Sequence, residues 1–219
     1  GGAATFTQIV ESEIFTGNLY GLNKACRLVG SPQIRNKGTI GGNIANGSAA
    51  ADSVPPLICL DASIVLESIH NTREIKLEDY YKNQIKIEEN ELIAKIHFKK
   101  PLENQILAFS KLGLRKALAI SRLTIATLLE LDEDNRIKNI IVSSGALAKY
   151  PIREVELEEF FLGKILDEEN IKQGIIVLQN SMDKRLAGRS TLPYKRVAVE
   201  RILREALYEA SNLDKVVAL

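Results

Sequence analysis

The sequence is poor in the residues that build metal centres and nucleophilic active sites. Its 219 residues include two cysteines, two histidines and one methionine, and it has no tryptophan. An iron–sulfur cluster generally needs four cysteines, and a structural zinc site needs four Cys or His ligands. His70 and His97 lie in no recognisable nucleophile or base motif. We therefore expect no metal cluster in this chain and no Ser-His-Asp or Cys-His catalysis.

Long apolar runs and an excess of one charge are also missing. No segment approaches the roughly 20 apolar residues that span a bilayer, and the N-terminal residues do not resemble a secretion signal. The 29 Lys and Arg residues nearly balance the 28 Asp and Glu residues, so no basic field favours nucleic acid. Cys26 and Cys59 lie in apolar stretches and are expected to be buried, reduced thiols. These features predict a cytoplasmic protein that binds neither membrane nor nucleic acid.

Hydrophobic spacing predicts an α+β chain in two parts, residues 1–100 and 105–212, divided near Pro101. In the first part we expect helices at 7–15 and 19–29, a loop at 31–53, a hairpin at 63–77 and a strand at 91–98. The second part is expected to hold strands at 106–112, 117–131 and 136–148. Three helices are expected to follow, at 155–163, 167–182 and 192–210.

The segment 38–52 is too rich in glycine and polar residues to be a core strand. Gly41 and Gly42 permit close backbone approach, and successive N–H groups in such a turn form a nest that suits a pyrophosphate. Thr39 and Asn43 flank the glycines, and Asp52 follows as a carboxylate that accepts from ribose or ribityl hydroxyls. The spacing is that of neither a P-loop nor a Rossmann turn. A plain glycine turn between core elements explains the pattern equally well.

A longer pattern is more specific. The run GSPQIRNKGTIGGNIANGSAAADSVPPLICLDA closely resembles the FAD-binding subunit, or middle domain, of the xanthine dehydrogenase and carbon monoxide dehydrogenase family of molybdenum hydroxylases. Downstream, FSKLGLRKALAISR resembles a strand of that family in which Lys111 is followed by Arg115, and STLPYKRVAVERILREAL resembles its closing helix.

The resemblance implies a fold and a set of site residues. Residues 1–100 would form the second half of a vanillyl-alcohol-oxidase (PCMH) type FAD-binding subdomain. Residues 105–212 would form a C-terminal domain with a three-stranded antiparallel sheet and helices. By the same resemblance, the residues that bind the FAD pyrophosphate, its polyol portion and the flavin surroundings are Thr39, Ile40, Gly41, Gly42, Asn43, Asp52, Ile93 and Lys111. Without the resemblance, Ile93 reads equally well as a core residue and Lys111 as a solvated lysine.

The resemblance also implies a function and partners. An FAD subunit of this family receives electrons from the [2Fe–2S] clusters of an iron–sulfur subunit, while a third subunit carries molybdopterin. The FAD then delivers the electrons to NAD or another acceptor. The alternatives are an FAD-free structural or interaction fragment of such a subunit and, less well supported, an unrelated enzyme with a phosphate-binding loop.

The first residues add one expectation. GGAATF is similar to an I-G-A-x-T element that in the family follows an N-terminal subdomain of about 50 to 60 residues, a normal size for such a unit. That subdomain carries a second glycine-rich stretch. The similarity predicts a chain that holds half of the pyrophosphate site, binds FAD weakly or comes without it, and has its 38–52 loop in an open or partly mobile conformation.

Overall fold

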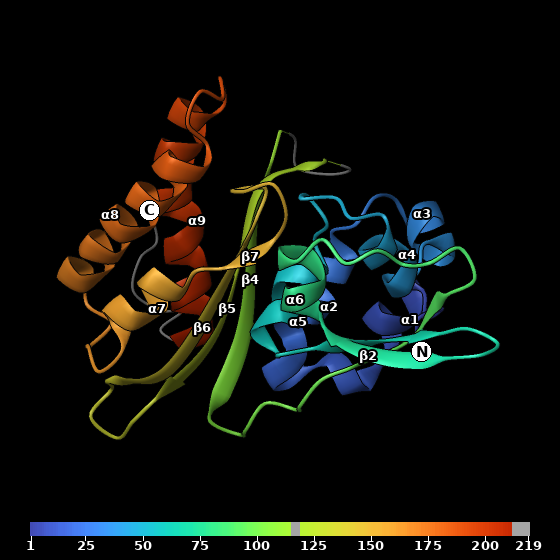
Figure 1. Cartoon of the computed structure of the whole chain (residues 1–219). Helices are drawn as coiled ribbons and strands as arrows, with labels where there is room; N and C mark the ends of the chain where they lie inside the picture. The colour runs from blue at the N-terminus through green and yellow to red at the C-terminus, as the bar shows by residue number, and fades with distance from the viewer. Residues whose placement is uncertain (115–118, 212–219) are drawn as a thin grey trace.

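The computed structural model describes residues 1–114 and 119–211. It confirms the predicted α+β class, with an antiparallel sheet standing between two groups of helices (Figure 1). The helices are α1 Phe6–Glu11, α2 Tyr20–Arg27, α3 Pro32–Lys37, α4 Ile40–Ala45, α5 Val54–Cys59, α6 Leu77–Lys82, α7 Val155–Phe161, α8 Glu168–Arg185 and α9 Leu192–Ser211. The strands are β1 Ser63–Glu67, β2 Thr72–Lys76, β3 Leu92–His97, β4 Gln105–Gly113, β5 Ser121–Leu131, β6 Ile137–Gly145 and β7 Ile152–Arg153.

The N-terminal part contains a small antiparallel sheet in the order β2-β1-β3. The predicted hairpin is β1 paired with β2, and the predicted strand at 91–98 is β3, which pairs with the other edge of β1. Alternation places Ile64 and Leu66 in the core while Glu67 remains half-buried. This pattern fits a sheet with one covered face.

The C-terminal part is built on the sheet β4-β5-β6-β7. Its three long strands are the antiparallel strands expected from the sequence, and the two-residue β7 extends the sheet at the β6 edge. The leucine-rich segment predicted as a strand over 117–131 is β5 over its residues 121–131. Arg115 lies outside the described residues.

The two faces of this sheet belong to two different cores. Leu107 and Phe109 of β4 pack with the N-terminal helices, whereas Ala108 packs with α7, α8 and α9. The same period of two divides β5, with Ala126 on the first face and Ile125 on the second. The N-terminal helices therefore lie against one face of the sheet and α9 against the other, as Figure 1 shows.

The expectation of a loop over 31–53 is wrong, because two short helices, α3 and α4, occupy part of that segment. Ser31 caps α3 by accepting from the Ile34 N–H, and Pro32 fills the first turn. Thr39 caps α4 in the same way. In both helices the side chain of the cap residue accepts from the backbone N–H three positions later. These Ser and Thr caps are the sequence signal for the two helices, and the glycine-rich composition of the segment obscured it.

None of the helices in the described ranges is both long and apolar enough to cross a membrane.

Candidate functional site

The glycine turn is the N-terminus of α4, and its backbone donors are already engaged. The Ile40 N–H donates to Ala4 at 2.9 Å and the Gly41 N–H donates to Gly2 at 2.9 Å. The Gly42 N–H donates to the Thr39 hydroxyl at 3.0 Å. The free nest of N–H groups expected from the sequence is therefore absent from residues 40–42, and side chains provide the donors that remain.

Gly41 has no room for a side chain, because the backbone of Gly2 packs against it. A Cβ on Gly41 would lie 2.7 Å from the Gly2 carbonyl oxygen, and a Cβ on Gly2 would fall on the carbonyl oxygen of Ile93. The Gly2 N–H also donates to Ala94 of β3 at 2.7 Å. Gly2 thus ties the glycine turn to β3, and this contact brings Ile93 beside the turn.

Gly42 differs from Gly41 because it is exposed. Beyond its own helix backbone and chain neighbours, a Cβ on Gly42 would meet a single atom within residues 1–114 and 119–211, the Thr39 hydroxyl oxygen at 2.9 Å. That hydroxyl accepts the Gly42 N–H and keeps its own hydrogen for donation outward. Gly42 therefore offers an open backbone surface beside a free hydroxyl donor.

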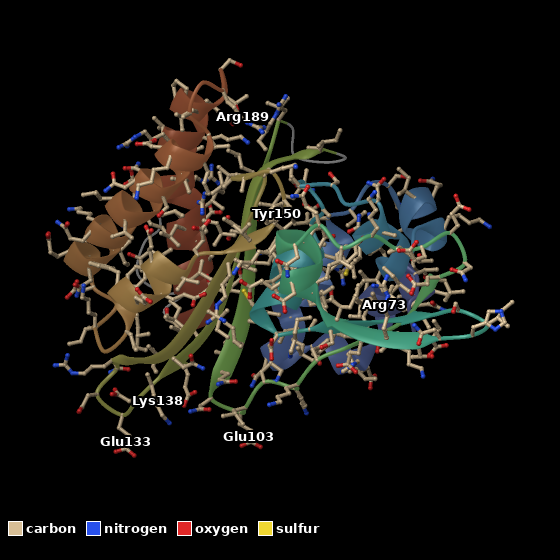
Figure 2. The ribbon with its side chains drawn as sticks, in the orientation of Figure 1. Arg73, Glu103, Glu133, Lys138, Tyr150 and Arg189 are labelled. Atoms are coloured by element: carbon tan, nitrogen blue, oxygen red, sulfur yellow. The ribbon has the colours of Figure 1, made fainter. Side chains whose placement is uncertain are left out.

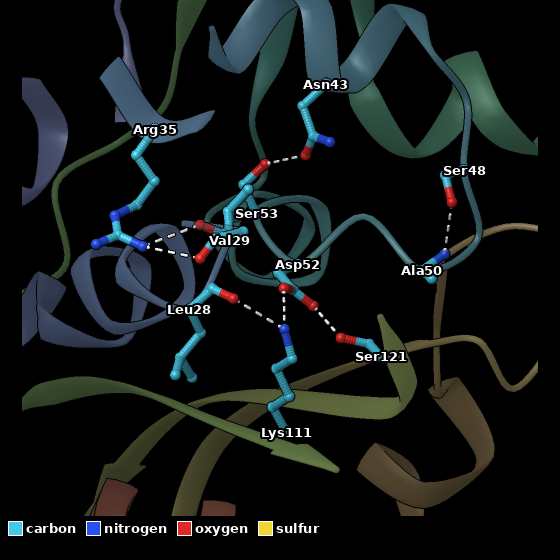
Figure 3. A network of polar contacts seen from close by, with 11 residues as sticks. Leu28, Val29, Arg35, Asn43, Ser48, Ala50, Asp52, Ser53, Lys111 and Ser121 are labelled. Atoms are coloured by element: carbon cyan, nitrogen blue, oxygen red, sulfur yellow. Dashed lines mark hydrogen bonds and ion pairs between the residues drawn. The ribbon is translucent and has the colours of Figure 1, made fainter. Parts of the chain in front are cut away.

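Asn43 provides a second donor at this surface. Its side-chain oxygen accepts from the Ser53 hydroxyl at 2.8 Å. This bond fixes the amide so that its nitrogen points away from Ser53, as Figure 3 shows. The arrangement suits an anionic group of a ligand, because a phosphate oxygen accepts hydrogen bonds from hydroxyl and amide donors such as those of Thr39 and Asn43. The segment is closed by contacts with residues 2, 4, 53 and 146, so the expected open segment at 38–52 is wrong.

Asp52, ten residues after Gly42, forms a buried ion pair with Lys111 of β4. The Lys111 ammonium lies 2.5 Å from Asp52 Oδ2, and their side chains are 8% and 6% exposed. The ammonium also donates to the Leu28 carbonyl at 3.0 Å, and the Ser121 hydroxyl donates to Asp52 Oδ1. Figure 3 shows these groups converging from the end of α2, from the segment before α5, and from β4 and β5. Lys111 is therefore not a solvated lysine.

Burial dominates the electrostatics of this pair. It raises the pKa of the Asp52 carboxyl above its ordinary value, while the charge of Lys111 and the hydrogen bonds from Lys111 and Ser121 oppose the rise. A carboxylate held in this way has both oxygens turned to protein donors. The Asp52 carboxylate therefore holds the Lys111 ammonium in place, a contact that the sequence alone did not indicate.

The structure thus groups the candidate residues in two places. Thr39, Ile40, Gly41, Gly42 and Asn43 form the glycine turn, with Ile93 behind it; Ile93 is 8% exposed and belongs to the first core. Asp52 and Lys111 form the second place, and the Asn43–Ser53 bond links the two. Sequence reasoning missed Gly2 and Ser121, because neither carries a signal without knowledge of its distant partner.

Comparisons with known proteins match both parts of the chain to known domain families. Residues 1–101 match the family model described as the FAD binding domain in molybdopterin dehydrogenase. Residues 108–210 match the CO dehydrogenase flavoprotein C-terminal domain. These two matches place the chain among the flavoproteins of molybdopterin dehydrogenases.

Individual relatives narrow the class to FAD subunits of dehydrogenases. The chain is 32% identical over 210 residues to the nicotinate dehydrogenase FAD-subunit of Eubacterium barkeri, covering 94% of this chain and 71% of that one. It is 26% identical to the carbon monoxide dehydrogenase medium chain of Afipia carboxidovorans, covering 98% and 75%. A solved structure, the reconstituted CO dehydrogenase from Oligotropha carboxidovorans, superposes with a TM-score of 0.86 at 25% identity, covering 97% and 74%. The chain belongs to the family of FAD-binding subunits of molybdopterin dehydrogenases.

Proposed function

We propose that this chain holds the FAD of a molybdenum-containing dehydrogenase complex and passes electrons from the [2Fe–2S] clusters of a partner subunit, through FAD, to NAD or another acceptor. The observation that carries the proposal is the exposed Gly42 between two side-chain donors, Thr39 and Asn43, within the matched FAD-binding domain. FAD supplies the redox chemistry when bound, and the protein supplies position and a polar frame.

Within this proposal the residues of the glycine turn divide into two roles. The Thr39 hydroxyl and the Asn43 amide nitrogen donate to the pyrophosphate, and Gly42 leaves the space for it. Ile40 and Gly41 hold the turn in place through their bonds to Ala4 and Gly2. Hydrogen bonds to a charged acceptor contribute roughly 1.5–3 kcal/mol each, so the two side chains matter measurably.

The second group of residues orients a charge. Asp52 and the Leu28 carbonyl hold the Lys111 ammonium in one position. By the family resemblance, Lys111 and Ile93 lie near the flavin ring. A fixed positive charge near a redox group favours its reduced, more negative form. Lys111 supplies this charge, and Asp52 contributes only by positioning the Lys111 ammonium.

The partners follow from what the chain lacks. Two cysteines do not ligate a cluster, so the clusters and the molybdopterin belong to other subunits. The relative from Afipia carboxidovorans is named a medium chain, which supports an assembly of several chains. The alternative is an FAD-free structural subunit, and an absorbance spectrum of a complex purified with this chain distinguishes it from our proposal. A spectrum without flavin absorbance in the near ultraviolet and blue would contradict our proposal.

Asn43→Asp is expected to weaken FAD binding by at least about tenfold. The new carboxylate still accepts from Ser53, but it replaces an amide donor with a negative charge facing the pyrophosphate. Loss of one charged hydrogen bond at about 1.5 kcal/mol already gives that factor, since 1.4 kcal/mol is tenfold. FAD titration by flavin fluorescence measures the change.

Asn46→Asp is the matched control, because it makes the same exchange at the exposed C-terminal end of α4. It should leave FAD affinity within about threefold of the parent, since a surface charge in water contributes little. Gly42→Val should abolish binding by filling the space beside Thr39. Equal affinities for Asn43→Asp and Asn46→Asp would contradict the assignment of Asn43.

A further inference from the structure

Lys195 in α9 is a buried cation that the proposed flavin site does not use. It is 9% exposed, although lysine is almost never fully buried without a partner. Its ammonium donates to the carbonyl oxygen of Ala146, immediately after β6. A carbonyl oxygen neutralises no charge, and the remaining hydrogens of the ammonium are left for another acceptor.

Two arginines lie near enough to Lys195 for their charges to act on it. The pairing of Thr124 in β5 with Gly145 in β6 brings Arg122 close to Ala146, whose carbonyl accepts from Lys195. Arg189 is in the turn that leads into α9, where its carbonyl accepts the Leu192 N–H at 3.0 Å. Arg122 is in β5, which packs against α9. Both guanidinium groups are exposed, and Figure 2 places Arg189 at the end of the α8–α9 pair, beside the tip of the large sheet. Arg189 and Lys195 belong to one stretch of chain, and Arg122 comes from a distant strand.

No carboxylate within residues 1–114 and 119–211 forms an ion pair with any of these three side chains. By contrast, nearby Arg185 and Arg196 pair with Glu154 and Asp183. Burial, followed by the charges of Arg189 and Arg122, lowers the pKa of Lys195 below its ordinary value. A buried ammonium repelled by two arginines costs stability unless an anion compensates it.

We propose that Lys195, Arg122 and Arg189 form a binding site for the phosphate group of a small anionic ligand. A phosphate offers several strong acceptor oxygens, which suits one ammonium and two forked guanidinium groups. A single carboxylate has too few oxygens to accept from all three. The two arginines are exposed and so accessible to a ligand, whereas Lys195 is buried.

The site lies at the same end of the large sheet as the buried Asp52–Lys111 pair. Arg122 follows Ser121, which donates to Asp52. The Ala146 N–H donates to the Ala49 carbonyl at 2.7 Å, in the segment that leads to Asp52. A phosphate at Lys195 therefore sits next to the proposed flavin site but uses none of its residues, so the proposal survives if the flavin assignment fails.

The test measures thermal unfolding of the full chain in added sodium phosphate, with sodium chloride at equal ionic strength as the reference. A ligand that binds only the folded state raises the midpoint in a saturable way. We expect a saturable rise in phosphate and none in chloride. Parallel titrations with ADP and NAD distinguish a free phosphate from a nucleotide phosphate as the source, because the tighter of these ligands identifies it.

Three variants locate the site. Lys195→Met should abolish the phosphate-induced rise while leaving the midpoint in chloride unchanged or higher, because it removes an uncompensated buried charge. Arg189→Ala, at an exposed position that should not affect folding, should weaken phosphate binding by about tenfold, as expected for one lost charged hydrogen bond. Lys82→Met, at an exposed lysine of α6, is the control and should respond like the parent.

Two results would overturn the proposal. One is an equal rise in chloride and in every phosphate ligand, which would indicate general screening. The other is a parent-like phosphate response in both Lys195→Met and Arg189→Ala. A lower midpoint for Lys195→Met in chloride, with the phosphate response of Arg189→Ala intact, would assign Lys195 to packing alone.

Discussion

Lys111→Met is expected to lower the free energy of unfolding by about 3–5 kcal/mol at neutral pH, the usual cost of removing one partner of a buried ion pair. Methionine keeps most of the side-chain volume, so packing is largely preserved. What remains is the Asp52 carboxylate, 6% exposed, with Ser121 as its remaining side-chain donor. Urea denaturation of parent and variant gives the difference directly.

The double variant Asp52→Asn/Lys111→Met supplies the control. Replacing both charges by neutral groups of similar shape is often neutral or stabilising. The double variant should therefore recover most of the stability lost by Lys111→Met, and the cycle should give a coupling energy of several kcal/mol. Additive losses would mean that the pair is solvated and that Asp52 does not hold Lys111.

The loss of stability in the single variant Lys111→Met should depend on pH. A raised pKa for Asp52 means that the folded state binds its proton more readily than the unfolded state, whose carboxyl titrates near pH 3.9. Stability from this group is therefore present at low pH and lost as pH rises through the folded-state pKa. Lys111→Met removes an opposing charge and raises that pKa further. Its destabilisation should be smaller at about pH 5 than at about pH 8, and Asp52→Asn should abolish this difference.

Much of the fold follows from local patterns. The hairpin of β1 and β2, the three long strands of the large sheet and the three C-terminal helices all have periodicity that predicts them. The segment 31–53 is the exception, because its two helices are each six residues long and depend on the N-caps Ser31 and Thr39. Short capped helices carry too few periodic residues to outweigh glycine and asparagine.

The site was predictable as a list of residues but not as an arrangement. The glycine pattern and the family resemblance point to Thr39 through Asn43, to Asp52 and to Lys111. The sequence does not reveal that Asp52 and Lys111, 59 residues apart, contact each other. It also treats Gly41 and Gly42 alike, whereas one faces the Gly2 backbone and the other faces outward. Both distinctions depend on contacts between distant segments, which no local pattern encodes.

The two adjacent glycines should consequently lose different amounts of stability when each is replaced by alanine. Gly41→Ala places a methyl group 2.7 Å from the Gly2 carbonyl oxygen and 3.1 Å from its carbon, and both belong to backbone that is bonded to β3. Overpacking costs typically 1–3 kcal/mol and occasionally more, and backbone neighbours give way least. We expect Gly41→Ala to lose about 3 kcal/mol of unfolding free energy, and Gly2→Ala to lose at least as much because its methyl group would overlap the Ile93 carbonyl.

Gly42→Ala is the matched comparison one residue away. Its methyl group meets only the Thr39 hydroxyl, a side-chain atom that rotates aside at the expense of the helix cap. Loss of such a cap costs about 1 kcal/mol, so the unfolding free energy should fall by no more than that. FAD affinity should fall clearly in Gly42→Ala, while in Gly41→Ala any loss of affinity should accompany the loss of stability. Guanidinium denaturation and FAD titration of the three variants separate these outcomes. A Gly41→Ala protein as stable as the parent would show that Gly2 does not hold the turn against β3, and that the division of roles between the two glycines is wrong.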